Sequence, residues 1–519
     1  MTKAKDIVDV FVIGGGVNGA GIARDAAGRG LSVVLAEKGD LASGTSSGST
    51  KLFHGGLRYL EYFKVRLVRE SLIEREVLLR AMPHISWPMR FVLPLHPDMR
   101  FPQDTPVAKV LGLLMPWAKG RRPAWVIRLG LFFYDTLGGR KILPATGSVD
   151  LSKDVAGLPL VPKIRRAFEY SDCWVDDARL VLLNARDAQA RGARILTRTK
   201  VTKATREGSN WCITVQDQNG SHQIRARALV NAAGPWVSQI VDDVVQTNSR
   251  EGVTLVRGSH IIVPRLYDHD RAYFLQGSDG RIIFTIPYEQ DFTLIGTTDE
   301  AHETADQAPE CSPEERDYLI DFAAQYFKEP ITPQDVVWTY SGVRPLYDDG
   351  ASSATAATRD YVLTLKDEGA PLLNVFGGKI TTYRRLAEAA LGRLGSFFPK
   401  AGAAWTAGVA LPGGAFEVAD KPELITRLKD DFEFLTDVWA ARLIRTYGLE
   451  AWQVLGAARS HPDLGQDFGA TLTEAELRWM HGQEFAQTAE DALWRRTKLG
   501  LRLDQTQKEA VQEWFDAQR

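Results

Sequence analysis

The stretch from Asp9 to Glu37, DVFVIGGGVNGAGIARDAAGRGLSVVLAE, constrains the fold of this chain more than any other. An apolar run ends on a GxGxxG pattern made by Gly14, Gly16 and Gly19, and small apolar residues then recur at helical spacing. A second apolar run, Leu31 to Leu35, comes just before Glu37. A strand, glycine turn, helix, strand and acid in this order are typical of a dinucleotide-binding βαβ unit.

Each residue of this motif has a physical task. Gly14 turns the chain tightly, Gly16 lets the backbone approach a pyrophosphate, and Gly19 lets the helix pack close to the strand. The amides that open the helix face the phosphates, and Glu37 can accept hydrogen bonds from the adenosine ribose. The flanking strands and the terminal acid favour dinucleotide binding over an ordinary glycine-rich turn, but the motif alone leaves FAD and NAD open.

Composition excludes several classes of protein. With 519 residues, 44% of them hydrophobic, the chain is globular and long enough for two or more cores. Its 63 Lys and Arg against 65 Asp and Glu give a net charge of -2, so nothing favours a nucleic-acid partner. The three cysteines are too widely spaced for a metal or redox motif, which predicts reduced thiols in a cytoplasmic setting and no metal. The N-terminus enters the first strand almost at once, so we expect no cleavable secretory signal.

A polar segment follows the motif, from Gly39 to Glu61, and it is dense in Gly, Ser and Thr. Short hydroxyls and unobstructed amides of this kind line a cofactor's pyrophosphate and ribityl chain. A surface loop would be the default interpretation of such a composition. Lys51, His54, Arg58 and Tyr59 are concentrated within the segment, however, and this favours a functional site.

Later segments indicate a second site, a second sheet and a further domain. Leu373 to Arg384, LNVFGGKITTYR, resembles a strand that enters a helix at a glycine pair, which is a candidate anion or dipole site. Leu229 to Gly234 predicts a buried strand that runs into a small-residue turn. Alternating apolar and polar residues from Val253 to Thr298 predict an antiparallel or mixed sheet distinct from the nucleotide-binding one. After about residue 410 the pattern becomes that of amphipathic helices, so we expect a domain boundary there.

The stretch between Pro94 and Pro123 contains an apolar piece, Val107 to Trp117, and a basic cluster, Lys119 to Arg122. Apolar residues, tryptophan and adjacent cations are the ingredients of a helix that lies in a membrane interface. A helix packed on its own domain explains the pattern equally well, and both interpretations stay open. The piece is shorter than the roughly 20 residues that a membrane-spanning helix needs.

Taken together and in order, these motifs resemble the FAD-dependent glycerol-3-phosphate dehydrogenases of aerobic metabolism. The resemblance covers nearly the whole chain. The segments that carry it are VIGGGVNGAGIARDAAGRGLSV, TSSGSTKLFHGGLRYLE, EYSDCWVDDARLV, NAAGPWV, RGSHIIVP, IGTTD, WTYSGVRPL, TRDY, VFGGKITTYRRLAE and EDALWRRTK.

The resemblance implies an α/β (α+β) fold with three parts. A glutathione-reductase-like FAD-binding Rossmann domain, formed by residues of about 7–90, 165–250 and 340–400, is expected to interleave with an antiparallel-sheet substrate domain, about 91–164 and 251–339. A C-terminal all-α domain would occupy 411–519. The implied reaction oxidises sn-glycerol 3-phosphate at C2 to dihydroxyacetone phosphate, passes hydride to FAD and then electrons to a membrane quinone. The protein would be cytoplasmic and peripheral on the inner face of the cytoplasmic membrane, with a homodimer left open.

FAD rather than NAD is favoured because the Ser/Thr-rich loop and the distant FGGKITT turn together suit a long cofactor whose flavin end needs its own helix terminus. The resemblance distributes the cofactor contacts along the chain. The pyrophosphate is assigned to Gly14, Gly16, Asn18 and Gly19, the ribose to Glu37, the ribityl chain and flavin to Thr45, Ser46, Ser47, Lys51 and Leu52, the adenine side to Ala233 and Gly234, and the flavin O2 edge to Gly378, Lys379, Ile380, Thr381 and Thr382.

A small dianionic substrate needs fixed cations. Arg58, Arg344, Arg359 and Lys379 lie in the matching motifs; we assign Arg344 and Arg359 to the phosphate, with Lys379 and Tyr59 near the hydroxyl end. Oxidation at C2 also needs a proton acceptor. His54 and His260 are both candidates, and the sequence does not choose between them, while Lys379 or Arg344 would be able to stabilise an alkoxide.

Three rival functions remain at this level. A glycerol-3-phosphate oxidase would use oxygen as the acceptor after the same first half-reaction. An amine or amino-acid oxidase of the same FAD superfamily would need no phosphate site. A dinucleotide-sensing binding protein would have no turnover at all.

Overall fold

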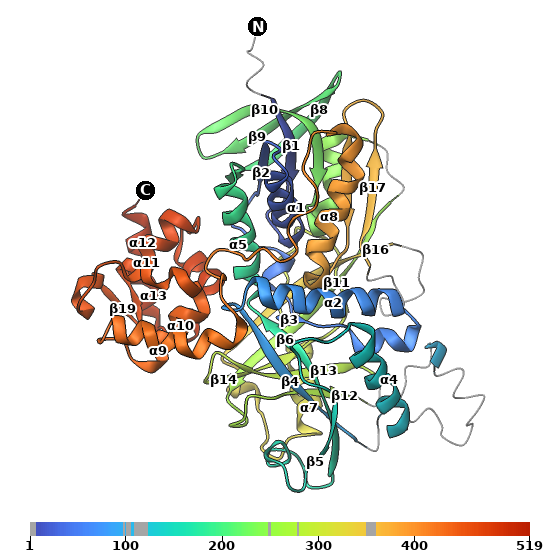
Figure 1. The fold of residues 1–519 in the computed structure, drawn as a ribbon, viewed down its shortest axis with the longest axis vertical. Helices are drawn as coiled ribbons and strands as arrows, with labels where there is room; N and C mark the ends of the chain where they lie inside the picture. Colours follow the sequence, from blue (N-terminus) through green and yellow to red (C-terminus); the bar gives the residue numbers. More distant parts are fainter. Residues whose placement is uncertain are drawn as a thin grey trace.

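The computed structural model describes residues 7–96, 99, 105–107, 123–247, 251–277, 280–348 and 360–518. Two large sheets form the body of the molecule, and the C-terminal helices pack beside them (Figure 1). The first sheet and its helices occupy the upper half of the view and the second sheet occupies the lower half.

The first sheet is built on the βαβ unit that the sequence predicts. Its strands in spatial order are β17 (Val362–Lys366), β18 (Leu372–Phe376), β10 (Gly220–Asn231), β1 (Ile7–Ile13), β2 (Val33–Ala36) and β7 (Arg194–Leu196), with β9 (Asn210–Asp217) and β8 (Lys200–Glu207) continuing from β10. The five strands from β18 to β7 are parallel to their neighbours. The central β1 is buried along its second half because its apolar run is covered on both faces.

Three helices cover one face of this sheet: α1 (Val17–Gly28), α5 (Asp177–Ala190) and α8 (Tyr383–Leu394). Helix α1 lies in the middle, and its alanines and glycines let its neighbours approach closely. A Cβ on Gly21 would lie 2.8 Å from the ring of Tyr383 in α8. The opposite face packs against the antiparallel ribbon of β8 and β9 and the apolar side of the segment Ile240–Val245.

The second sheet is antiparallel except at one pair, β4 with β12. Its strands are, in spatial order, β15 (Glu300–Ala301), β11 (Val253–Pro264), β14 (Phe292–Gly296), β13 (Ile282–Tyr288), β12 (Ala272–Gln276), β4 (Ser86–Pro94), β6 (Arg166–Val175) and β3 (Leu52–Phe53), with β16 (Trp338–Tyr347) on β11 and β5 (Gly147–Asp150) on β6. Helix α7 (Pro313–Ala324) packs on one face, and α2 (Val65–Ala81) and α4 (Ala124–Leu137) pack on the other.

The C-terminal region forms its own hydrophobic core. It is helical apart from one hairpin, β19 (Asp467–Gly469) with β20 (Leu472–Thr473). Its helices are α9 (Lys421–Asp431), α10 (Asp437–Tyr447), α11 (Ala451–Leu455), α12 (Glu474–Gln483) and α13 (Gln505–Asp516).

The predicted fold class is confirmed: a parallel nucleotide-binding sheet, an antiparallel second sheet and a helical C-terminal region are all present. The exact division into sequence segments stays a prediction. The strands β6 and β16, which fall in the segments predicted to bind FAD, pair within the second sheet. Chain segments therefore pass from one sheet to the other, and the space between the sheets is lined by both.

Candidate functional site

An elongated cavity of about 730 Å³ lies between the two sheets. Gly14 and Glu37 border one end, and His260, Arg344 and Lys379 border the other. The cavity therefore connects the βαβ motif with the cationic residues that the sequence marks as candidates.

The glycine turn between β1 and α1 is sterically closed to larger residues. Gly14 has a φ of +108°, and a Cβ there would meet the carbonyl oxygen of Ala232 at 2.5 Å. A Cβ on Gly19 would lie 1.9 Å from the carbonyl oxygen of Gly14, so this glycine packs the helix onto its own turn and does not border the cavity. Gly16 does border it, and the first amide of α1, on Val17, donates to Ser46 Oγ over 3.0 Å.

Glu37 stands at the end of β2, and its carboxylate accepts hydrogen bonds from two amides. The donors are Gly15, at 2.7 Å, and Gly39, at 2.8 Å. Burial raises the pKa of Glu37, and the two amide donors oppose that rise. The acid thus fixes the turn after β2, and its role toward a ribose stays a prediction.

Asn18 connects the two glycine turns of the cavity. Its Nδ2 donates to the carbonyl oxygen of Gly377 over 3.1 Å. Gly377 and Gly378 have φ values of +68° and +103°, a conformation that side chains other than glycine rarely adopt. The glycine pair leads through a short 3-10 turn, Ile380–Thr382, into α8, as the sequence predicts.

The loop from Thr45 to Leu52 divides into residues that face the cavity and residues that lie behind it. Thr45 and Ser46 border the cavity, as do Gly48, Ser49 and Thr50. Three residues that the sequence assigns to the cofactor do not: Ser47, Lys51 and Leu52. Lys51 is fully buried, and its Nζ lies 2.6 Å from Asp177 Oδ1 and 3.0 Å from the carbonyl oxygen of Ser47. It holds the loop from behind.

The other residues assigned to the cofactor divide in the same way. Ala233 and Gly234 border the same end as Gly14 and Glu37, which we call the adenosine end. Gly378, Lys379 and Ile380 border the other end, which we call the substrate end. Thr381 and Thr382 are buried beneath the turn. The Thr381 hydroxyl accepts from the backbone amide of His54 at 3.3 Å, so it supports the neighbouring loop rather than lining the cavity.

The substrate end brings together six of the seven predicted catalytic residues. His54, Arg58 and Tyr59 come from the loop after β3, His260 from β11, Arg344 from β16 and Lys379 from the second glycine turn; all six border the cavity. The Lys379 ammonium lies 3.7 Å from the centre of the Tyr59 ring. Arg359 lies outside the described residues.

His260 is buried with one nitrogen engaged. Its Nε2 lies 2.9 Å from the Thr50 hydroxyl, and its ring stacks on Tyr340 with 4.6 Å between centroids. Its Nδ1 makes no hydrogen bond to any residue that the structure describes. Burial, reinforced by the positive charges of Lys51 and Arg344, holds the pKa of His260 well below 6.5. The imidazole is therefore neutral near pH 7.

Arg344 is held in one orientation by its neighbours. One nitrogen, Nη1, lies 2.7 Å from Asp299 Oδ1, and the other, Nη2, donates to the carbonyl oxygen of Thr298 over 2.8 Å. Gly258 leaves room for the guanidinium, because a Cβ there would lie 2.2 Å from Nη2. The guanidinium is thus fixed at the edge of the cavity.

The charged residues of the cavity lining that sequence reasoning missed include Asp172, Arg281 and Asp299. Asp299 lies within the IGTTD motif, and its position beside Arg344 depends on strand pairing that no local pattern encodes. Asp172 pairs with Arg75 at 2.6 Å and accepts from the Tyr134 hydroxyl at 2.8 Å, which in turn accepts from the Gly55 amide. It thereby supports the turn that precedes Arg58. No signal in the sequence singles out Arg281.

The residues present fit FAD. A glycine cradle closed to any Cβ stands at the start of a helix, and a second helix start faces the other end of a cavity long enough to connect them. A family described as FAD dependent oxidoreductase matches residues 9–384, and one described as the C-terminal domain of alpha-glycerophosphate oxidase matches residues 404–517. The fold and the site therefore define an FAD-dependent oxidoreductase.

Similar proteins narrow this class. D-erythritol 1-phosphate dehydrogenase of Brucella abortus (strain 2308) is 51% identical over 98% of this chain and 97% of its own. Aerobic glycerol-3-phosphate dehydrogenase of Escherichia coli (strain K12) is 48% identical over the same shares. The X-ray structure of the glycerol-3-phosphate dehydrogenase from Bacillus halodurans complexed with FAD matches with a TM-score of 0.74 and 27% identity, over 99% of this chain and 91% of that one. The chain belongs to the FAD-dependent glycerol-3-phosphate dehydrogenase family.

Proposed function

We propose that the protein oxidises sn-glycerol 3-phosphate at C2 to dihydroxyacetone phosphate and passes the electrons to a membrane quinone. The observation that carries this proposal is that Arg58, Arg344 and Lys379 line the same cavity as a neutral, buried histidine, His260. Cations suit a phosphate, and the histidine suits a hydroxyl that must lose its proton. Bound FAD supplies the hydride acceptor.

Arg344 is the phosphate ligand that the geometry favours. A fixed guanidinium presents paired donors that match two phosphate oxygens, and its orientation is already set by Asp299 and Thr298. Preorganisation of this kind reduces the entropy lost when a small substrate binds. Arg359 is proposed as a second phosphate ligand on the sequence pattern alone.

His260 is the proton acceptor that the geometry favours over His54. His260 borders the cavity, its Nε2 is engaged by Thr50, and its Nδ1 makes no hydrogen bond to a described residue. Stacking on Tyr340 fixes the ring, and the low pKa keeps it in the form that can accept a proton. Lys379, beside Tyr59, is proposed to stabilise the oxygen at C2 as the proton leaves.

A second candidate substrate is D-erythritol 1-phosphate, because the Brucella relative that carries this activity in its name is 51% identical over nearly the full chain. Both compounds are phosphorylated polyols, and they differ by one hydroxymethylene group. The experiment is a comparison of kcat/KM for the two phosphates with a soluble quinone analogue as acceptor. We expect the ratio to favour glycerol 3-phosphate; a ratio that favours the tetritol phosphate would transfer the assignment to that substrate.

The electron acceptor is tested in the same assay. A dehydrogenase should reduce the quinone analogue much faster than it produces hydrogen peroxide in air. Rapid peroxide formation without added quinone would support the oxidase alternative. An amino-acid oxidase activity would appear as flavin reduction by amino acids instead of phosphates.

The quinone acceptor implies association with a membrane surface, for which α4 provides support. None of the described helices combines the length with the apolar character that a bilayer crossing demands. On α4, however, Trp125, Leu129, Phe132 and Phe133 recur at helical spacing, and each side chain is about half exposed. Apart from Val107, the apolar piece that the sequence singles out lies outside the described residues. We place the protein on the inner face of the cytoplasmic membrane with α4 in the interface.

Vesicle sedimentation tests this orientation. A variant with Phe132→Ser and Phe133→Ser should lose binding to vesicles that contain anionic lipid. Val438→Ser, which changes a similarly exposed apolar residue on α10, is the matched control and should bind as the wild type does. Equal binding by the double variant would remove α4 from the proposal.

A further inference from the structure

The segment Asp491–Lys498, DALWRRTK, carries part of the family resemblance but has no part in the function proposed above. It opens with a single π-helical turn, Asp491–Arg496, and belongs to the C-terminal region. Its side chains contact residues outside that region that support both ends of the cofactor cavity. We refer to it as the DALWRRTK segment.

At the adenosine end, the segment holds the loop that follows Glu37. Arg495 Nε lies 2.6 Å from Asp40 Oδ2, and Arg496 Nη2 lies 2.8 Å from Asp40 Oδ1. Asp40 is buried, and the two arginines provide the opposite charge that a buried carboxylate needs. Asp491 adds a pair with Arg198 at 2.6 Å, and the amide of Arg198 donates to the carbonyl oxygen of Gly39.

At the substrate end, ion pairs connect the segment to the Ser/Thr-rich loop. Lys498 Nζ lies 3.5 Å from Asp176 Oδ2, at the N-terminus of α5. The next residue, Asp177, binds Lys51 Nζ at 2.6 Å and the Ser49 hydroxyl at 2.7 Å. Two adjacent carboxylates thus join the C-terminal region to the loop that borders the cavity.

A column of aromatic rings makes the second connection at this end. Trp494 stacks on Trp338 with 4.4 Å between centroids, and Trp338 contacts Tyr340 at 5.2 Å. Tyr340 in turn stacks on His260 at 4.6 Å, with the planes 10° apart. The Tyr340 hydroxyl also donates to the carbonyl oxygen of Ser49 over 2.8 Å. The position of the His260 ring therefore depends on a tryptophan of another region.

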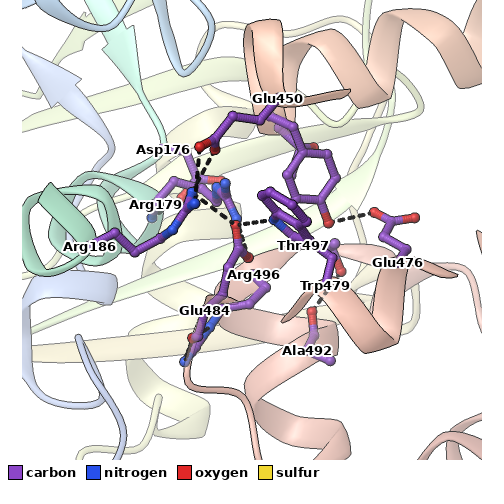
Figure 2. Close-up of polar contacts among 12 residues, drawn as sticks. Asp176, Arg179, Arg186, Glu450, Glu476, Trp479, Glu484, Ala492, Arg496 and Thr497 are labelled. Atoms are coloured by element: carbon purple, nitrogen blue, oxygen red, sulfur yellow. Dashed lines mark hydrogen bonds and ion pairs between the residues drawn. The ribbon is translucent and has the colours of Figure 1, made fainter. Parts of the chain in front are cut away.

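Ion pairs and hydrogen bonds hold the base of the segment, as Figure 2 shows. Arg179 on α5 pairs with Glu484 at 2.7 Å, and both side chains are almost completely buried. Arg186 pairs with Glu450, and Arg496 donates to the backbone carbonyl of Glu484. The Arg179–Glu484 and Arg186–Glu450 pairs join the C-terminal region to α5 without contacting the cavity loops. One set of ion pairs therefore holds the C-terminal region against α5, and a different set of contacts connects the DALWRRTK segment to the cavity loops.

We propose that the DALWRRTK segment positions both ends of the cofactor site: Arg495 and Arg496 fix the adenosine-side loop through Asp40, and Trp494 is a positioning residue for His260. The part that concerns His260 rests on the proposed function, in which this histidine accepts the substrate proton. The part that concerns Asp40 depends only on FAD binding. A 1 Å displacement of a reacting group costs as much as about a hundredfold in rate. We therefore expect a ring that reaches His260 through Trp338 and Tyr340 to have a measurable effect.

The proposed role of Trp494 at the substrate end is tested by stopped-flow measurement of flavin reduction. The purified holoenzyme is mixed with saturating glycerol 3-phosphate under anaerobic conditions. Trp494→Ala should slow flavin reduction by roughly tenfold or more, and Trp494→Phe should recover most of the rate because it retains a ring for stacking. Trp452→Ala is the matched control. Trp452 also packs partly buried on the C-terminal core, and its Nε1 donates to Asp431, away from the cavity.

The adenosine end is tested by the rate at which flavin fluorescence appears when each holoenzyme is diluted. Arg495→Met should release FAD roughly tenfold faster than the wild type. Arg186→Met is the control, because it also removes an arginine from an interregional pair but one that contacts neither cavity loop. It should release FAD at the wild-type rate.

Equal reduction rates for Trp494→Ala and Trp452→Ala, together with equal FAD release by Arg495→Met and Arg186→Met, would reduce the segment to an adhesive contact and overturn the inference. If Trp494→Ala does not fold, Trp494→Leu replaces it with the same expectation, since it keeps apolar volume without a ring. Failure of the proposed function would look different. The wild-type flavin would then not be reduced by glycerol 3-phosphate, while the comparison of FAD release would remain decisive for the adenosine end.

Discussion

The two ends of the cofactor cavity are built in different ways. The adenosine end comes from one contiguous motif, Asp9 to Glu37, and relies on backbone amides and on glycines that leave no room for a Cβ. The substrate end is assembled from side chains on β11, β16, the loop after β3 and the second glycine turn. Steric fit determines the first end, and placement of charge determines the second.

This difference separates binding from chemistry. A change at the adenosine end should affect whether the cofactor is held, whereas a change at the substrate end should affect what the held cofactor does. A substitution that changes only FAD retention, or only the turnover of the FAD-loaded enzyme, supports this difference between the ends. Substitutions that move both would show that the ends are mechanically one unit.

The largest effect is expected from Gly19→Ala. Its Cβ would lie 1.9 Å from the carbonyl oxygen of Gly14, so either the helix or the turn must shift. Overpacking of this kind costs about 1–3 kcal/mol and occasionally more, and we expect the purified protein to contain little flavin. The ratio of flavin to protein absorbance measures this. Gly392→Ala, in the exposed part of α8 where a Cβ meets nothing within 4 Å, should retain flavin and be slightly stabilised. Normal flavin content in Gly19→Ala would contradict the steric account.

Arg344→Ala should leave flavin content close to that of the wild type but lower kcat/KM for glycerol 3-phosphate by roughly 10²- to 10³-fold. The substrate phosphate would lose its fixed ligand, and loss of one partner from a charge pair that is enclosed on binding costs about 2–5 kcal/mol. Arg344→Lys should recover little, because one ammonium cannot replace both nitrogens that contact Asp299 and Thr298. Steady-state kinetics with flavin quantification checks this. A decrease in kcat/KM of less than fivefold would mean that residues other than Arg344 bind the phosphate.

A smaller effect is expected from Glu37→Gln. The Glu37 carboxylate accepts one hydrogen bond from the Gly15 amide and one from the Gly39 amide. The glutamine side chain has only one oxygen that can accept, and it carries no negative charge. A change of about 1 kcal/mol corresponds to roughly fivefold faster FAD release. Dilution experiments followed by flavin fluorescence measure it. The rate of flavin reduction in the FAD-loaded variant should stay close to that of the wild type. A fold decrease in this rate that exceeds the fold increase in FAD release would contradict the separation of the two ends.

The last prediction concerns the dependence of stability on pH. Burial holds the pKa of both His84 and His260 well below 6.5, with nearby cations adding to the shift. Below pH 6.5 the unfolded chain therefore binds protons that the native protein does not. Stability should fall as the pH drops through 6.5, by as much as about 1.4 kcal/mol per pH unit for each histidine.

His84 lies outside both ends of the cavity, so it isolates this effect. Its two ring nitrogens are buried and make no hydrogen bond to described residues. His84→Leu should show a smaller decrease in melting temperature between pH 7 and pH 5.5 than the wild type. Identical decreases would mean that His84 is not neutral in the native protein.

The sequence predicted the adenosine end well because its information is local. Glycine spacing, the apolar runs and the terminal acid all fall within one short stretch, and the structure contains the strand, helix and strand in that order. The helix start after the second glycine pair was predictable for the same reason. The fold class followed from these two turns and the alternating pattern of the second sheet.

The substrate end was only partly predictable because it depends on pairing across the chain. Arg344 was a candidate from its motif, but its contact with Asp299 exists only because β11 lies between β14 and β16. Lys51 was assigned to the cofactor from its position in a polar loop, yet its ion pair with Asp177 turns it away from the cavity. The stack from Trp494 to His260 joins residues far apart in the sequence, and no local pattern encodes it.

The most direct test of the account is anaerobic addition of glycerol 3-phosphate to the purified yellow holoenzyme. We predict that the flavin absorbance near 450 nm disappears in the wild type, that Arg344→Ala bleaches much more slowly at the same substrate concentration, and that the colour returns on addition of a quinone analogue. A wild-type flavin that stays oxidised in the presence of excess glycerol 3-phosphate would contradict the assignment of the substrate end.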